Sequence, residues 1–306
     1  MMKKFTLSAL ALVAAAVAAP AFAQSSVTMY GRLNTTVESQ KVNSGARAWV
    51  VNNNASRIGF KGVEDMGGGM KASFNLEHGF NSDTGAAAST FWGREAWVQV
   101  AGDFGAVRLG RQTPESYFAT ADYVSMHNHD TGSSEDNLYG GPFLQSNKVA
   151  YFTPTMGGLS AVFAVSAGEG APGVKRGYDF ATNYVAGPLH LGFGYSDQGN
   201  QDQWAARALY ELGAFTFGGY YQQVDNGPGT PKYKNVRLAA MYTMGASEFH
   251  FNIGRATAAD QWTLGYNYNL SKRTKIYGYF TDRDTNKNAR RSGEYSSLAV
   301  GVRHNF

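Results

Sequence analysis

The sequence contains no cysteine and only 8 proline residues among 306. Without thiols, neither a disulfide-stapled extracellular module nor a metal site built on thiolates is possible. Beyond residue 23, no apolar run reaches the roughly 18 residues that a membrane-spanning helix needs, so any membrane insertion must use strands. The 27 Lys and Arg barely exceed the 23 Asp and Glu, whereas nucleic-acid-binding proteins carry clustered basic charge. We therefore expect no nucleic-acid partner.

The first 23 residues have the layout of a cleavable secretory signal. Lys3 and Lys4 precede an apolar stretch over 5–17, and Ala21-Phe22-Ala23 supplies the small residues of a cleavage site. We expect a signal peptide at 1–23 and one exported domain over 24–306.

Glycine and aromatic residues are abundant, with 37 Gly, 18 Tyr and 19 Phe. Apolar and polar residues alternate with a period of two over many segments, which is the pattern of strands with one apolar and one polar face. Such segments are 27–37, 70–77, 189–196, 215–221, 262–268 and 297–306. The pattern predicts an all-β fold.

Short, mostly glycine-containing turns separate these strands, and longer polar stretches alternate with the turns. The turns are 66–69, 102–105, 156–158, 187–188, 212–214, 244–246 and 270–273, and the longer stretches include 42–55, 81–90, 167–176, 224–233 and 282–295. Seven turns imply sixteen strands. Short turns at one end and long loops at the other are typical of an outer-membrane barrel, whose closure satisfies all backbone hydrogen bonds in lipid. Aromatic residues gather near the turns, which suits the headgroup boundary, although aromatics favour strands in any case.

Several segments resemble the betaproteobacterial general porins of the neisserial and comamonad type. They are SVTMYG (26–31), SRIGFKG (56–62) followed by Glu64-Asp65, FGAVRLGRQ (104–112), NKVAYFTP (147–154), LSKRT (270–274) and GVRHNF (301–306), and the match covers the whole mature chain. The resemblance implies a homotrimer of sixteen-stranded transmembrane antiparallel β-barrels that passes small hydrophilic solutes and ions across the cell outer membrane. It also implies a third external loop folded into the pore, and contacts with outer-membrane lipid and lipopolysaccharide. The final Phe306 resembles the signal read by the barrel-assembly machinery.

The widest gap between turns holds residues 113–146, which show no regular alternation. A structureless connection of this length is usually functional. It contains Glu115, Asp122, Asp130, Glu135 and Asp136 and neither Lys nor Arg. We expect this loop to narrow the pore, and an acidic loop facing a basic wall would set up a transverse field.

Strand parity supplies the basic wall, because side chains opposite an apolar face point into the lumen. The residues so placed are Arg32, Arg57, Lys61, Arg108 and Lys148, and on weaker grounds Arg207, Arg237 and Arg303. The resemblance adds Arg94 and Glu77 as constriction residues. Parity alone puts Arg94 on the apolar face with Ala96 and Val98, which a bulge near the strand end would reconcile. Leu144 stands where the family often has an arginine, and this weakens the basic cluster. Each of these charges could also be an ordinary solvated lumen residue.

Two other motifs give only weak indications of a cofactor or metal site. The segment 168–173 spells a dinucleotide fingerprint, but Pro172 and the polar residues after it open no helix to hold a pyrophosphate. The run His127-Asn128-His129-Asp130 could bind a metal, but lacks a supporting shell. We therefore expect no cofactor, no metal and no enzyme activity.

Three functions remain: a diffusion channel with mild anion preference, a non-conducting structural or adhesion barrel of the outer membrane, and an exported soluble all-β binding protein or hydrolase. A plugged barrel would carry large apolar residues on its lumen face, whereas Gly, Ser, Asn, Thr and Arg dominate that face here. A soluble sandwich would need packed inner faces on both sheets. The sequence favours the channel.

Overall fold

The computed structural model describes residues 26–127, 137–170, 172–257, 259–285 and 294–306. The expected signal peptide at 1–23 and the loop carboxylates Asp130, Glu135 and Asp136 lie outside the described residues, so their predicted roles stay predictions.

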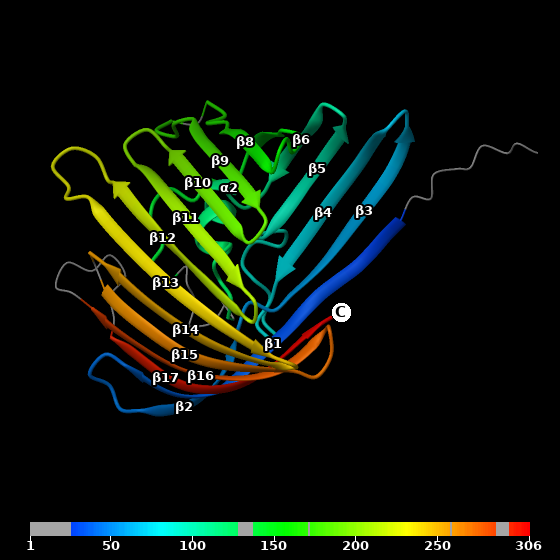
Figure 1. The fold of residues 1–306 in the computed structure, drawn as a ribbon. Helices are drawn as coiled ribbons and strands as arrows, with labels where there is room; N and C mark the ends of the chain where they lie inside the picture. Colours follow the sequence, from blue (N-terminus) through cyan, green and yellow to red (C-terminus); the bar gives the residue numbers. More distant parts are fainter. Residues whose placement is uncertain (1–25, 128–136, 171, 258, 286–293) are drawn as a thin grey trace, which may run out of the picture.

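Strands run around a closed antiparallel ring in chain order (Figure 1). Those described are β1 (Ser26–Val42), β2 (Ala48–Asn53), β3 (Arg57–Gly67), β4 (Met70–Gly79), β5 (Glu95–Gly102), β6 (Gly105–Arg111), β7 (Lys148–Phe152), β8 (Leu159–Ser166), β9 (Gly177–Ala186), β10 (Leu189–Asp197), β11 (Asp202–Leu212), β12 (Phe215–Asp225), β13 (Tyr233–Met244), β14 (Ser247–Ala256), β15 (Ala259–Asn269), β16 (Thr274–Thr285) and β17 (Tyr295–Asn305).

The barrel closes where β1 meets β17 on one side and both β2 and β3 on the other. Residues 54–56 interrupt the ladder between β2 and β3, which are therefore two halves of one barrel strand. Counted in this way the barrel has sixteen strands, as the turns predicted. The sequence predicted a loop over 42–55. This prediction was wrong for 48–53, which form β2. Phe306 and Gly31 exchange two backbone hydrogen bonds of 3.0 and 3.1 Å beside this seam.

All seven predicted turns join neighbouring strands as hairpins, from the β3–β4 turn to the β15–β16 turn. The connections at the opposite end include the longest one, between β6 and β7. Two of them, at 198–201 between β10 and β11 and at 257–258 between β14 and β15, are as short as the hairpin turns. The predicted difference in length between the two ends thus holds for the main loops.

The two faces of each strand differ as the alternation predicted. On β1, Val27, Leu33 and Val37 are exposed on the outside, whereas Asn34 and Glu38 are buried inside. The same holds around the ring, so the outer surface carries an apolar band and the interior is polar, which is the pattern of a barrel in lipid.

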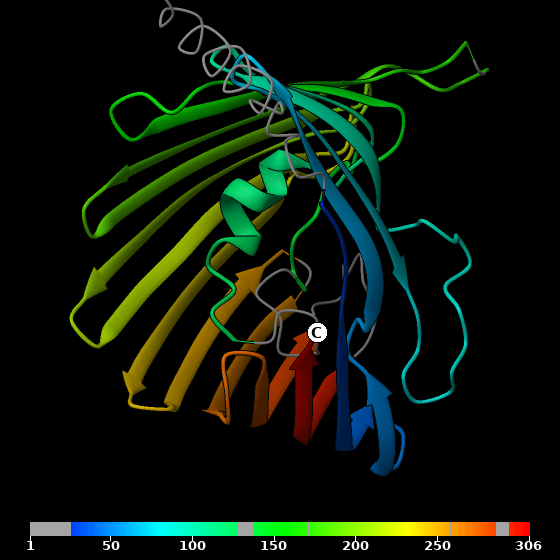
Figure 2. The same ribbon diagram turned by 90° about the vertical axis from the view of Figure 1, so that its right-hand side faces the viewer.

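The long connection between β6 and β7 turns into the barrel (Figure 2). It begins with α2 (Glu115–Tyr117) and η1 (Phe118–Asp122), which pack against β9, β10, β11 and β12. Among the described residues no helix is long and apolar enough to cross a membrane. The loop buries its apolar side chains on the wall, in a cluster of Tyr117, Ala121, Val124 and Tyr139 with Ala205, Leu209 and Tyr220. It therefore covers one side of the interior and leaves the other side open.

Candidate functional site: the pore constriction

A cavity of about 690 Å³ lies between the inner loop and the wall formed by β3 to β6. The wall contributes mostly charged and polar side chains, and the loop contributes three aromatic rings together with polar groups. Its lining is Arg57, Asn75, Glu77, Gly93, Arg94, Glu95, Trp97, Arg108, Thr113, Tyr117, Phe118, Asp122, Phe143 and Gln145. These side chains are the ones that border the open space between the loop and the wall.

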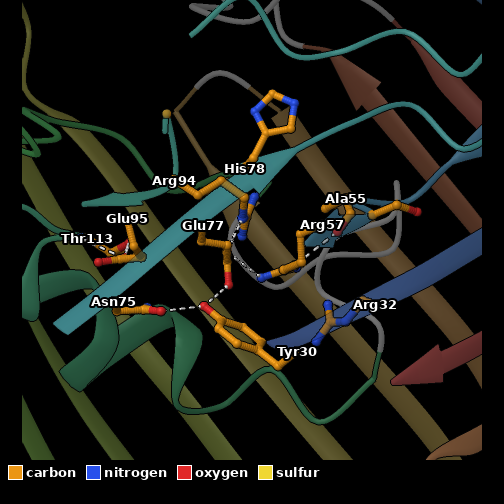
Figure 3. Close-up of polar contacts among 12 residues, drawn as sticks. Tyr30, Arg32, Ala55, Arg57, Asn75, Glu77, His78, Arg94, Glu95 and Thr113 are labelled. Carbon is orange, nitrogen blue, oxygen red and sulfur yellow. Dashed lines mark hydrogen bonds and ion pairs between the residues drawn. The ribbon is translucent and has the colours of Figure 1, made fainter. Parts of the chain in front are cut away.

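Glu77 on β4 organises the basic wall (Figure 3). Arg94 Nε donates to its carboxylate at 2.5 Å and Arg57 Nη1 lies 3.6 Å from the same oxygen, while the Tyr30 hydroxyl donates to the other oxygen at 2.9 Å. Two arginines thus share one carboxylate, which leaves an excess of positive charge at this point. The Arg94 side chain is 35% exposed and the Glu77 side chain only 10%, so water in the pore meets the guanidinium more than the carboxylate.

Arg94 reaches this cluster without a bulge. It lies just before β5, which starts at Glu95, so strand parity does not govern its direction. Its backbone N–H donates to the carbonyl of Glu77 at 3.3 Å. Parity failed for Arg94 because β5 begins one residue later than the alternation suggested.

Arg108 and Glu115 join the wall to the loop. Their side chains form an ion pair at 3.5 Å, and the guanidinium lies over the ring of Trp97, 4.2 Å from its centroid. Burial raises the pKa of Glu115 to about 7, and the opposing effect of Arg108 is smaller. Glu115 therefore touches the basic wall directly instead of facing it across water, and it exchanges a proton near neutral pH.

The other predicted pore residues fall near this cavity. Arg32 is the cross-strand partner of Arg57 and bonds to Asn305 at 3.4 Å. Lys61 extends over the ring of Tyr30, 5.0 Å from its centroid. Asp122, at the end of η1, lines the cavity from the loop side.

Lys148 does not line the water-filled space, which corrects the sequence analysis. Its side chain is 0% exposed and lies 2.9 Å from Asp179 on β9. The same carboxylate accepts the backbone N–H groups of Glu115 at 2.8 Å and Ser116 at 3.3 Å, and the hydroxyl of Ser196 at 3.0 Å. Strand parity placed Lys148 inside the barrel correctly, but the loop then covered it.

Asp179 is the functional residue that sequence reasoning missed. It holds the first turn of α2 against the wall, and neighbouring glycines make room for this contact. A Cβ on Gly194 would lie 2.5 Å from the carbonyl oxygen of Ser116. The available signal was a lone carboxylate within the alternating strand β9, with Gly192 and Gly194 on the adjacent strand.

Of the three weaker candidates, Arg207 and Arg237 lie on the far wall and are covered by hydrogen-bonding partners, whereas Arg303 is only half-buried. Arg237 is fully buried and donates to Asn252 and Gln261 at 3.1 and 3.0 Å. Arg207 donates to the carbonyl of Ala119 at 3.0 Å and lies over the ring of Tyr123. Arg303, near the closing seam, bonds to Asn305 at 3.4 Å. Leu144 stands where the resemblance suggested an arginine. It is buried against Gly177 of β9 and packs the last part of the loop, before β7, against the wall.

The two weak motifs gain no support from the fold. In the candidate metal run, His127 is buried beside His250 and the remaining residues lie outside the described part of the chain. Over the residues that the structure describes, no group of three His, Asp or Glu side chains is placed to hold a metal. The glycines of 168–173 lie in the connection between β8 and β9 and not between a strand and a helix.

Comparison with known proteins agrees with this architecture. Residues 9–288 match the family model described as Gram-negative porin. The chain is 30% identical over 357 residues to outer membrane porin protein 32 of Delftia acidovorans, with all of both chains covered. It is 26% identical over 330 residues to major outer membrane protein P.IB of Neisseria meningitidis, which covers 94% of this chain and 86% of that protein.

Solved structures give the same result. An anion-selective porin from Comamonas acidovorans superposes with a TM-score of 0.76 at 29% identity, covering 92% of this chain and 100% of that one. OmpF of Salmonella typhi shares the fold, with a TM-score of 0.73 at 14% identity. The sixteen-stranded barrel, its inward loop and these matches together show that the chain belongs to the Gram-negative porin family and is an outer-membrane β-barrel channel.

Proposed function

We propose that the protein passes small hydrophilic solutes and ions by diffusion, without catalytic chemistry, and with a mild preference for anions. The observation that carries this proposal is the cluster in which Arg57 and Arg94 share the single carboxylate of Glu77 at the cavity wall. Because low-dielectric walls focus the field of such charges into the pore, even a small excess acts on passing ions.

The charge balance around the cavity supports a preference that is mild. The basic side chains are Arg32, Arg57, Lys61, Arg94 and Arg108, and the acidic ones are Glu77, Glu95, Glu115 and Asp122. Glu95 is engaged by the hydroxyl and the backbone N–H of Thr113, at 2.7 and 3.1 Å. A surplus of one positive charge gives selectivity that screening weakens, because the Debye length falls from about 10 Å at 0.1 M salt to about 3 Å at 1 M.

The name of the structural neighbour from Comamonas acidovorans, an anion-selective porin, points in the same direction. The loop over 113–146 sets the size limit in this proposal, since its helical part, α2 and η1, packs inside the barrel against β9–β12.

We further propose that the protein works as a homotrimer, is exported with cleavage of 1–23, and is inserted by the barrel-assembly machinery through Phe306. In the membrane it contacts outer-membrane lipid and lipopolysaccharide. The exposed apolar band supports contact with lipid. Because Phe306 bonds to Gly31 beside the closing seam, we propose that it also helps to close the barrel.

Planar-bilayer recording tests the channel directly. We expect stepwise insertion of conducting units and a reversal potential of the anion-selective sign in a KCl gradient. Silent bilayers from a folded, detergent-stable preparation would overturn the channel, and would favour a structural barrel.

A further inference from the structure

The loop side of the constriction exposes aromatic rings beside its polar groups. Phe118 and Phe143 line the cavity and remain 38% and 46% exposed. The interior face of the barrel is otherwise rich in amides, hydroxyls and charges, so two exposed phenyl rings in a water-filled passage are unexpected. Exposed apolar surface inside a pore indicates contact with something that passes through it.

These rings are held in place and are not loose side chains. The ring of Tyr117, itself buried, lies 6.0 Å from that of Phe118 and 5.3 Å from that of Phe143, in tilted and edge-on arrangements typical of aromatic packing. Tyr139 supports Tyr117 from behind, with 5.4 Å between their centroids. The loop therefore presents a fixed aromatic surface to the pore.

The opposite side of the same cavity presents guanidinium groups. Arg94 is the most exposed member of the ion-pair cluster, and Trp97 adds a further ring beside Arg108. Arginine binds a carboxylate with two parallel hydrogen bonds. The volume, about 690 Å³, falls within the range of about 300–1,000 Å³ that small-molecule sites occupy.

We propose that the constriction favours small aromatic carboxylates over aliphatic carboxylates of the same charge. The carboxylate of the solute bonds to Arg94 or Arg57, and its ring packs against Phe118 and Phe143. Glu77, Glu95 and Asp122 line the same cavity and disfavour solutes with more than one negative charge. This inference rests on the proposed function, since it names the solutes that such a channel would pass best.

Bi-ionic reversal potentials test the proposal on the intact channel in planar bilayers. Chloride on one side is set against benzoate, cyclohexanecarboxylate or acetate on the other. We expect the permeability ratio of benzoate to cyclohexanecarboxylate to exceed the ratio of their mobilities in water. The double variant Phe118→Leu with Phe143→Leu keeps apolar side chains but removes the rings, and should lower this excess by about three-fold, the effect of roughly one aromatic contact.

Two controls separate the possible outcomes. Phe104→Leu, an exposed ring at the β5–β6 turn, should leave the ratio unchanged, and Arg94→Gln should reduce the permeability of all three carboxylates together. If the double variant forms no channels, the single variant Phe143→Leu replaces it. An unchanged ratio of benzoate to cyclohexanecarboxylate in variant channels that still conduct KCl would overturn the aromatic preference. Absence of anion selectivity in the wild type would instead overturn the proposed function.

Discussion

Both walls of the barrel interior carry arginines, but the arginines are placed differently. On the wall from β3 to β6, Arg57 and Arg94 meet at a cavity and share one carboxylate. On the wall from β9 to β16, Arg207 and Arg237 are almost fully buried and are held by carbonyl and amide oxygens.

The difference lies in what covers each wall. The inner loop packs α2 and η1 over β9–β12, where Arg207 lies, and leaves β3–β6 on the open side of the cavity. Arg237, on β13, is instead buried against Asn252 and Gln261 of the next two strands. A charge sealed under a loop is balanced by fixed dipoles and contributes to packing, while a charge at the cavity acts on ions that pass. Position in the lumen is therefore necessary for a role in selectivity but not sufficient.

We call the wall from β3 to β6 the open wall and the wall from β9 to β16 the covered wall. The largest expected effect on ion selectivity comes from reversing the charge of the open wall. Changing Arg57 and Arg94 to Glu turns the cluster at Glu77 from two arginines around one carboxylate into three carboxylates. We expect the anion-to-cation permeability ratio to fall by roughly ten-fold and the channel to become cation-selective. Reversal potentials in a KCl gradient measure this change.

The matched control is Arg255→Glu. Arg255 is 83% exposed on its side chain and lies away from the cavity. If both variants shift the reversal potential equally, the selectivity is a property of overall charge and not of the open wall.

The next effect comes from releasing the loop that covers the other wall. Asp179→Asn removes the charge that binds Lys148 and weakens the acceptor for the first turn of α2. Breaking a buried ion pair on one side costs about 3–5 kcal/mol, so the loop should lift and the single-channel conductance should rise and become noisier.

The exposed pair of Asp225 and Lys232, with side chains 32% and 52% exposed, provides the comparison. Asp225→Asn should change the conductance little, because solvent screens an exposed ion pair and it contributes little to stability. Equal conductances of the wild type and the Asp179 variant would contradict the anchoring role.

A smaller effect concerns pH. Burial raises the pKa of Glu115 to about 7, so this group gains a proton as the pH falls through that value. Arg108 then loses its ionic partner and the constriction gains one positive charge, which should increase anion selectivity on acidification. Reversal potentials recorded from about pH 8 to about pH 6 test this prediction.

The variant Glu115→Gln should hold the high selectivity over the whole of that range. The pH dependence of stability runs opposite to that of a carboxylate whose pKa is lowered in the folded protein. Since the pKa of Glu115 is higher in the folded state than its ordinary value of 4.5, its contribution is most favourable below that value and declines as the pH rises to about 7. A pH-dependent selectivity that persists in the variant would place the titrating group elsewhere.

The smallest effect on selectivity should come from the covered wall itself. Arg237→Gln removes a full positive charge, yet the guanidinium is buried and its acceptors are Asn252 and Gln261. We expect an unchanged reversal potential and a lower thermal stability, because a buried acceptor loses its donor at a cost of about 1–3 kcal/mol. If Arg237→Gln shifted the reversal potential as much as Arg94→Gln does, the two walls would not differ in their effect on selectivity.

The sequence predicted the barrel well, because the period of two and the seven turns are local signals that each strand carries by itself. It also predicted the inward direction of Arg57 and Arg108, which follows from the same parity. It could not predict which lumen residues the loop would cover, since this depends on contacts between distant segments such as Lys148, Asp179 and α2. The aromatic face formed by Phe118 and Phe143 was hidden for the same reason.

The reversal potential of the wild-type channel in a KCl gradient tests the central claim most directly. At low salt, near 0.1 M on the dilute side, we predict the anion-selective sign, and we predict that the preference fades as both sides approach about 1 M. A cation-selective sign, or a preference that does not respond to salt, would contradict the view that the guanidinium groups of the open wall control passage.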